Sequence, residues 1–337
     1  MLGGCACTCA VLRRTAERGK FWLNRVTNNA HRPNVAILLG TFCGAEFLSQ
    51  QLASIERQTY GHWRLYASDD GSPDGTLDIL RAFQERLGPS KVQLIQGPGK
   101  GFVFNFLSLI CNPDIQSEYF AFSDQDDIWE PDKLAIAVEQ LCAIPADVPS
   151  LYCSRTRLID AFGQEVGYSP LFRKRPSFAN ALVQNIAGGN TMVFNEAARQ
   201  YLVVAGGNVD VPSHDWWVYI VTSAVGGRVI YDRHCSIQYR RHPNNIVGTN
   251  IGIRPRLHRA RMLLKSRFKG WNDLHIKQLN GFREHMTLEN RTILERFCSA
   301  RMQALPRRII ALLRSGVYRQ TTLGNIGLIV GIVLKKI

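Results

Sequence analysis

Acidic side chains at the ends of two apolar runs are the residues of this sequence best suited to chemistry. The segment Ser123–Asp127 carries three carboxylates, those of Asp124, Asp126 and Asp127, and Ser68–Ser72 forms a second acidic turn. Isolated buried charges are strongly disfavoured, so such groups are paired or bind a metal. Mg²⁺ and Mn²⁺ are held by one or two carboxylates together with substrate phosphates. The two clusters together favour a metal–diphosphate site over the alternative, a pair of solvated acidic turns.

The sequence lacks the glycine-rich loops that commonly bind phosphates. A dinucleotide-binding domain has Gly-x-Gly-x-x-Gly after its first strand. The segment Gly40–Ala45 reads Gly-Thr-Phe-Cys-Gly-Ala at that place, and no Gly-Lys-Ser or Gly-Lys-Thr of a P-loop occurs. A metal and the acidic clusters are therefore expected to bind the phosphates instead.

The elements that must position these clusters alternate between apolar strands and helices with a 3.6-residue period. Strands are expected at 35–39, 63–67, 92–95 and 119–123, and helices at 45–58, 74–87, 102–110 and 131–141. This alternation predicts an α/β fold with a parallel sheet covered on both faces. Ligands of such sheets bind beyond the carboxyl ends of the strands. Thr41-Phe42, Asp69-Asp70 and residues 124–127 all lie at those ends, so they can converge.

The pattern changes after about residue 150, and this half is expected to supply the acceptor side. Strands are expected at 152–159, 192–194, 228–231 and 237–239, and a helix opens at Ser213–Trp217. We predict a basic extension at 1–34, a catalytic domain at 35–253 with halves 35–150 and 151–253, and a helical tail at 254–337.

The formal net charge of +14 is unevenly distributed over the 337 residues. Residues 1–34 carry six Lys/Arg and one acidic residue, residues 35–253 carry 17 and 22, and residues 254–337 carry 18 and four. An acidic body thus has two basic ends, and any anionic partner is expected at the ends.

Cysteine spacing and hydropathy indicate a cytosolic protein. The nine cysteines include no Cys-x-x-Cys pair, so reduced thiols are expected in place of disulfides or a zinc site. No apolar stretch reaches the roughly 18 residues that a membrane span requires. The N-terminus also lacks the basic n-region of a signal peptide.

A series of motifs carries a family resemblance. They are, in order, VAILLGTFCGAEFLSQQLASIERQTY, SDDGSPDGT, GPGKGF, SDQDDIWEPDKL, GGNTMVFN, HDWW and YRRHPNN. Over roughly residues 35–250 this series resembles family 2 glycosyltransferases, and SDQDDIW, HDWW and YRRHPNN are most similar to the bacterial rhamnosyltransferase branch. The resemblance implies a GT-A-like, Rossmann-type nucleotide-sugar-binding domain with a mixed central sheet. It is more specific for the family than for the sugar.

The resemblance also implies roles in the donor half. Thr41, Phe42 and Asp70 would line the nucleoside pocket, with Phe42 near the base and Asp70 accepting a base N–H. Asp124 would lie by the ribose or a metal-bound water. Lys100 would lie near the phosphates; its alternative is a solvated turn lysine.

The implied cofactor is Mg²⁺ or Mn²⁺ bridging the donor diphosphate. Asp126 would be its main protein ligand. His242 would lie near the phosphates as a candidate ligand, and its alternative is a surface histidine. The family often has Asn at the position of Cys43, so a polar contact beside the nucleoside is missing here.

In the acceptor half, the resemblance implies Asp215 as general base. The expected acceptor contacts are Gly189, Asn190, His214 and Trp216. A carboxylate that deprotonates the attacking hydroxyl contributes about 10²–10⁴-fold to the rate, and a metal stabilises the leaving diphosphate. The alternatives are that Asp215 caps a helix and that the tryptophans of HDWW are core side chains, of which one could instead stack on a sugar.

The tail shows a basic amphipathic pattern. Leu257, Arg261, Leu264, Phe268 and Trp271 follow helical spacing among basic residues, and apolar helical segments recur later. Such a helix is typical of binding to an anionic membrane surface. The alternative is a tail packed on the catalytic domain. Nucleic-acid binding is disfavoured because no reader motif is present.

We therefore expect an inverting, metal-dependent glycosyltransferase at the cytoplasmic face of the plasma membrane. It would move a sugar, rhamnose by the resemblance, from dTDP-rhamnose or a UDP-sugar to a lipid-linked saccharide in bacterial surface polysaccharide synthesis. The alternatives are a hexosyl- or N-acetylhexosaminyltransferase of the same fold and an inactive scaffold that binds lipid or nucleic acid. Donor-dependent release of nucleoside diphosphate distinguishes an enzyme from a scaffold.

Overall fold

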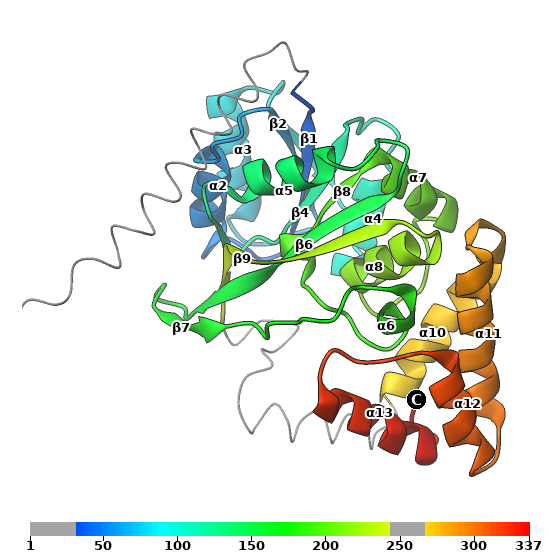
Figure 1. Cartoon of the computed structure of the whole chain (residues 1–337). Helices are drawn as coiled ribbons and strands as arrows, with labels where there is room; N and C mark the ends of the chain where they lie inside the picture. The colour runs from blue at the N-terminus through cyan, green and yellow to red at the C-terminus, as the bar shows by residue number, and fades with distance from the viewer. Residues whose placement is uncertain (1–31, 243–266) are drawn as a thin grey trace, which may run out of the picture. The chain divides into compact units, whose positions relative to one another are not determined.

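A mixed β-sheet organises the described part of the chain, residues 32–242 and 267–337 of a computed structural model (Figure 1). Within these residues nine strands form one sheet in the order β3-β2-β1-β4-β8-β6-β9-β5, and β7 pairs with β6. Nearly all of the expected N-terminal extension lies outside the described residues, as do Leu257, Arg261 and Leu264 of the tail.

The first four strands are parallel and lie where the apolar runs predict them. They are β1 (Val35–Thr41), β2 (Trp63–Asp69), β3 (Val92–Gln96) and β4 (Tyr119–Ser123). The accompanying helices are α2 (Leu48–Glu56), α3 (Thr76–Leu87), α4 (Phe102–Cys111) and α5 (Lys133–Cys142). Because the four strands are parallel, their carboxyl ends lie at one edge of the sheet.

The acceptor half adds antiparallel pairs and makes the sheet mixed. Its strands are β5 (Ile128–Trp129), β6 (Ser150–Ile159), β7 (Glu165–Tyr168), β8 (Val193–Asn195) and β9 (Arg228–Arg240). β8 lies antiparallel between β4 and β6, and β9 runs parallel to β6. The helices of this half are α6 (Phe178–Ala181), the 3₁₀ turn η1 (Gly189–Thr191), α7 (Glu196–Ala205) and α8 (His214–Ala224).

Strand β9 corrects the expectation of two short strands at 228–231 and 237–239. The backbone continues as one strand through both segments. Its register with β6 shifts on either side of Arg155, where Ser154 pairs with Asp232 and Thr156 with Ile237. β9 therefore has unpaired extra residues on either side of Cys235, which form a bulge. They interrupt the alternation of apolar residues without ending the strand, so this part of the sequence resembles a loop.

The described tail packs on the body. Its helices are α10 (Arg267–Gly281), the 3₁₀ turn η2 (Arg283–His285), α11 (Leu288–Met302), α12 (Arg307–Ser315) and α13 (Thr322–Val333), which lie beside α6 and α8 (Figure 1). The Asn290 side chain donates to the carbonyl oxygens of Ser223 (2.9 Å) and Ala224 (3.0 Å). Buried Phe297 and Leu328 belong to the same hydrophobic cluster as the side chains of α8.

Two further observations concern the described residues alone. None of their helices combines the length and apolarity that crossing a membrane requires. Their six cysteines have free thiols.

Candidate active site

The loop between β4 and β5 carries the acidic cluster to the carboxyl edge of the sheet. Gln125 fixes this loop against the end of β1, because its amide accepts from the Phe42 N–H (2.8 Å) and donates to the Phe42 carbonyl (2.9 Å). The sequence-predicted convergence of the strand ends is thus realised by a pair of hydrogen bonds across 83 residues.

Asp126 and His242, the two predicted metal residues, meet at this edge. Asp126 Oδ2 lies 2.7 Å from His242 Nε2. The buried guanidinium of Arg240 supports the pair, since its Nε donates to the Asp126 carbonyl (3.0 Å) and one Nη donates to Gln50 (2.7 Å). Arg240 lies within the YRRHPNN motif, but the sequence predicts no role for it, because its contact with the acidic loop depends on β9 lying beside β5.

Negative charge accumulates around these two residues. Burial raises the pKa of Asp124 to about 8, and the charges of Asp126 and Asp215 add to the shift. Burial, followed by the charges of Asp126 and Asp124, raises the pKa of Asp127 well above its ordinary value. The nearby ammonium of Lys133 is fully buried, and desolvation lowers its pKa to about 7. Burial and mutual repulsion thus disfavour the charged forms of Asp124 and Asp127, and a cation at this edge would offset both effects.

The donor set fits a hard divalent cation. Among the described residues no group of three or more His, Cys, Asp or Glu side chains is placed to hold a metal ion. Mg²⁺ needs fewer protein ligands, since it keeps waters and takes oxygen atoms from substrate phosphates. The pair of Asp126 and His242, with the carboxyls of Asp124 and Asp127 close by, matches that requirement.

Asp215 lies in the first turn of α8, on the acceptor side of the same edge. Its Oδ2 accepts from the Gly189 N–H (3.1 Å), and its Oδ1 accepts from the Trp216 N–H (2.6 Å). The N-cap position belongs to Ser213, so Asp215 is not the N-cap residue. Its carboxylate is only partly buried and remains reachable by a substrate.

Two consecutive residues of η1 join the two sides. The Gly189 N–H donates to Asp215, and the Asn190 side chain donates to the buried carboxyl of Asp127. A side chain at position 189 would not fit, because its Cβ would lie 2.6 Å from His214 Nε2. The sequence predicts both residues as acceptor contacts, and the structure adds this bridging position.

His214 and Trp216 lie behind the edge. The His214 ring stacks on Phe106 at 4.0 Å between centroids, and burial lowers its pKa to about 4. The Trp216 indole donates to the Ala181 carbonyl (2.6 Å) and packs against Trp271 of α10. Trp217 is also buried. Neither tryptophan therefore offers an open ring face to a sugar, because the tail covers α8.

The predicted nucleoside residues lie together at the ends of β1 and β2. Thr41 is buried and donates to Asp69 (2.8 Å). Asp70 accepts from the backbone N–H groups of Gly99 and Gly101, both at 2.7 Å, and so holds the loop that carries exposed Lys100. A carboxylate retains lone pairs for a further donor. The Phe42 ring is 56% exposed and open to stacking.

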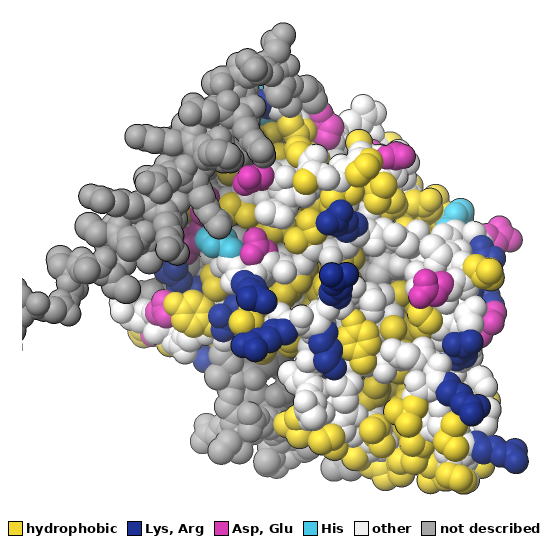
Figure 2. All heavy atoms as spheres, in the orientation of Figure 1, with side chains coloured by type: hydrophobic (Ala, Val, Ile, Leu, Met, Phe, Trp, Pro, Cys, Tyr) yellow, Lys and Arg dark blue, Asp and Glu magenta, His cyan; other side chains and the backbone are white. Residues whose placement is uncertain are grey.

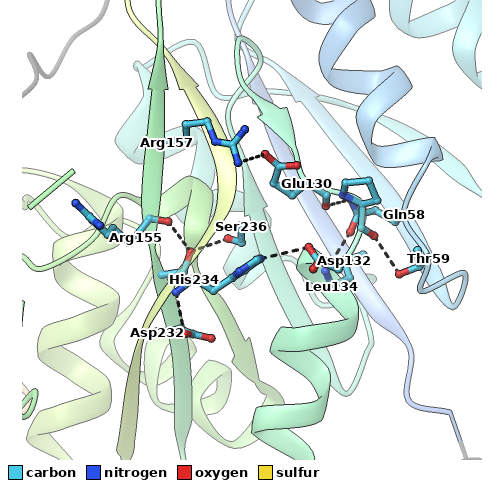
Figure 3. A network of polar contacts seen from close by, with 12 residues as sticks. Gln58, Thr59, Glu130, Asp132, Leu134, Arg155, Arg157, Asp232, His234 and Ser236 are labelled. Carbon is cyan, nitrogen blue, oxygen red and sulfur yellow. Dashed lines mark hydrogen bonds and ion pairs between the residues drawn. The ribbon is translucent and has the colours of Figure 1, made fainter. Parts of the chain in front are cut away.

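A polar network secures the chain that follows the acidic loop (Figure 3). The Gln58 amide donates to the Glu130 carbonyl (2.7 Å) and accepts from the Leu134 N–H (3.0 Å). The Glu130 N–H donates to the Ser236 carbonyl (2.9 Å) on β9, and His234 lies 3.4 Å from Asp132. The network joins α2, α5 and β9 around the segment between β5 and α5.

Comparisons with known proteins agree with this fold. The model of the family described as "Glycosyl transferase family 2" matches residues 37–202. The dTDP-rhamnosyl transferase RfbG of Shigella flexneri is 29% identical over 233 residues, which cover 66% of this chain and 77% of that protein.

Two solved structures share the fold. The mannosyltransferase PcManGT of Pyrobaculum calidifontis, in complex with GDP-Man and Mn²⁺, has a TM-score of 0.50 at 20% identity and covers 95% of this chain and 92% of its own. Residues 1–349 of TarS from S. aureus, with UDP-GlcNAc, have a TM-score of 0.50 at 14% identity and cover 90% of both chains.

The fold and these matches define the class, a GT-A-like glycosyltransferase. Residues 37–202 form a glycosyltransferase family 2 domain, and the chain is similar to the dTDP-rhamnosyl transferase RfbG.

Proposed function

We propose that this glycosyltransferase transfers its sugar with inversion, using Mg²⁺ or Mn²⁺ and Asp215 as general base. The observation that carries this proposal is the bridge formed by Gly189 and Asn190, which ties Asp215 to the acidic loop. A base on one side and a diphosphate site on the other are what a single displacement at the anomeric carbon requires.

Each residue has a defined task in this mechanism. Asp126 and His242 would hold the cation, which when bound supplies Lewis-acid stabilisation of the leaving diphosphate. Asp215 Oδ takes the proton of the acceptor hydroxyl as that hydroxyl attacks. Arg240 keeps the Asp126 backbone in place, and Phe42 stacks on the nucleobase.

For the substrates, we propose dTDP-rhamnose as donor and a lipid-linked saccharide as acceptor, at the inner face of the plasma membrane. The named activity of RfbG supports the donor. PcManGT with GDP-Man and TarS with UDP-GlcNAc show that other nucleotide sugars are bound on this fold. The second candidate is therefore a hexosyl- or N-acetylhexosaminyltransferase.

A donor panel tests the proposal. The protein is incubated with dTDP-rhamnose, UDP-glucose, UDP-galactose or UDP-N-acetylglucosamine, with and without Mn²⁺, and released nucleoside diphosphate is measured. We expect metal-dependent release, fastest from dTDP-rhamnose. Preference for a UDP-sugar would support the second candidate. A folded protein that neither binds nor cleaves any nucleotide sugar would contradict both and favour the scaffold.

A further inference from the structure

Helix α13 is apolar on the face that points away from the protein as well as on the face that packs. Leu328 and Ile332 are buried in the shared core. The outward residues are Leu323, Ile326, Ile329, Val330 and Leu334. Leu323 is 63% exposed and Ile326 is 53% exposed. A helix that is apolar on all sides is normally buried on all sides, because exposing one apolar face to water is unfavourable. An exposed apolar patch of this kind marks an interaction site.

Helix α12 and the turn before it extend this surface. Leu305, Ile310 and Leu313 are exposed there, while Leu312 is buried in the same core as Leu328. We call the eight outward residues of both helices the α12–α13 face: Leu305, Ile310, Leu313, Leu323, Ile326, Ile329, Val330 and Leu334. Figure 2 shows apolar side chains gathered where Figure 1 draws these helices, with basic side chains at their margin.

The charges within the segment that forms the face all have one sign. After Glu295 the sequence contains no Asp or Glu and eight Lys or Arg. Arg307, Arg314 and Lys335 of this set are exposed beside the α12–α13 face. An apolar face whose own segment carries only cations complements a surface that is apolar inside and anionic outside.

Lys335 occupies a position where a lysine is conformationally costly. Its φ is +56°. The Lys336 N–H donates to the Gly331 carbonyl (2.8 Å) and the Lys335 N–H to the Ile332 carbonyl (3.3 Å), which is the Schellman pattern whose left-handed residue is usually glycine. A charge is therefore present at the end of α13 although the backbone favours glycine.

We propose that the α12–α13 face docks onto the surface of an anionic lipid bilayer. Helix α13 has 12 residues, about 18 Å at 1.5 Å per residue, so it lies in the plane of the interface. The apolar side chains enter the boundary of the acyl chains, and the lysines and arginines contact lipid phosphates. The proposal rests on the proposed function in one respect, that docking brings the site to a lipid-linked acceptor.

Other occupants fit the face less well. A second copy of the chain in a two-fold contact would place the same cations opposite one another, and like charges across an interface are unfavourable. A single-stranded nucleic acid needs aromatic side chains for stacking, and the outward residues are all Leu, Ile or Val.

This proposal places the membrane-binding surface on α12 and α13, later in the tail than the sequence predicts. The sequence predicts anchoring by a helix that includes Phe268 and Trp271. In the structure Trp271 packs edge-to-face against Trp216 (5.9 Å between centroids) and against Phe268 (5.3 Å). Trp271 is therefore part of the contact between tail and body, and Phe268 packs against it from within α10.

Vesicle flotation of the full chain tests the proposal. The double variant Ile326→Glu/Ile329→Glu changes the face, and Val203→Glu/Val204→Glu on α7 is the matched control, because its valines are exposed to a similar extent. Vesicles contain phosphatidylcholine alone or with a third of phosphatidylglycerol. We expect wild type and control to bind the anionic vesicles, and the α13 variant to bind at least about tenfold less, because two apolar side chains no longer enter the interface. High salt should weaken but not abolish wild-type binding.

Thermal unfolding and nucleoside diphosphate release are measured for each variant. A loss of vesicle binding can then be distinguished from a loss of enzymatic activity. Should the double variant not fold, Lys335→Gln/Lys336→Gln takes its place, with a loss of the anionic-lipid preference expected. Equal binding by variant and control would overturn the proposal. Wild-type self-association through this face without vesicle binding, or binding to single-stranded nucleic acid alone, would do the same.

Discussion

The acidic edge of the sheet and the α12–α13 face differ in opposite ways from an ordinary protein surface and core: one buries charged groups and the other exposes apolar groups. At the edge, charged groups are withdrawn from water and held by partners far away in sequence, as Asp126 is by His242 across 116 residues. At the α12–α13 face, apolar groups stay in water and have no partner among the described residues, and all are drawn from one short stretch of chain. Chemistry and location are therefore expected to be separable by substitution.

The largest effect should come from Asp126→Ala. We expect nucleoside diphosphate release to fall to background, because the cation loses its main ligand. The fold should persist, since removing one carboxylate from an acidic cluster reduces repulsion. EDTA should have the same effect on wild type, reversed by Mn²⁺, and vesicle binding should not change. The exposed carboxylate of Asp78 on α3 gives the control, Asp78→Ala. Full activity of both Asp126→Ala and the EDTA-treated enzyme would show that the metal role is wrong.

Asp215→Asn should lower kcat by roughly 10²–10⁴-fold, the range of a lost general base. The amide oxygen can still accept from the Gly189 N–H, so donor affinity should barely change, and steady-state kinetics separate the two quantities. Asp210→Asn, at an exposed position nearby, should behave as wild type. A variant that keeps its kcat but unfolds at a lower temperature would assign Asp215 a role in the first turn of α8 instead.

The donor half could be predicted closely because its signals are local. Continuous apolar runs mark β1 to β4, and acidic turns mark their ends, so the boundaries agree to within about two residues. The sequence also predicts that Asp124, Asp126 and Asp215 share a site, through motifs in a fixed order.

What could not be predicted depends on contacts between distant segments. Strand β5 has two residues and exists because β9 lies beside it. The sequence predicts Trp216 as a candidate for stacking on a sugar, whereas in the structure Trp271 of α10 covers its ring. The outward face of α13 looks like an ordinary apolar helix in sequence, since only packing shows which side is left in water.

The boundary between body and tail should respond to acid through His275. This imidazole is fully buried beside Trp216 (4.6 Å between centroids), and desolvation lowers its pKa to about 3. The unfolded chain binds a proton near pH 6.5, so the stability from the neutral ring is complete above that pH and is lost as pH falls toward 3. We expect the free energy of unfolding of wild type to fall more steeply than that of His275→Leu, by at most about 1.4 kcal/mol per pH unit.

Urea titrations from pH 7 to pH 4 measure that difference in slope. His62→Leu removes an exposed histidine and should leave the slope as in wild type. Parallel curves for wild type and His275→Leu would contradict the prediction and indicate that the boundary opens before the ring is protonated.

The smallest effects should come from the two described non-glycine residues with positive φ, one in each region: Cys43 at +50° beside the nucleoside residues and Lys335 at +56° after α13. Asn tolerates this conformation better than other side chains. We expect Cys43→Asn and Lys335→Asn each to raise the free energy of unfolding by about 0.5 kcal/mol, measured by urea unfolding, whereas Cys43→Ala and Lys335→Ala should give no gain.

Cys43→Asn should leave vesicle binding unchanged. Lys335→Asn should leave turnover unchanged and weaken vesicle binding by roughly fivefold, the effect of one charge near an anionic surface. If both asparagine variants altered turnover and vesicle binding together, the two regions would be coupled, and the separation of chemistry from location would fail.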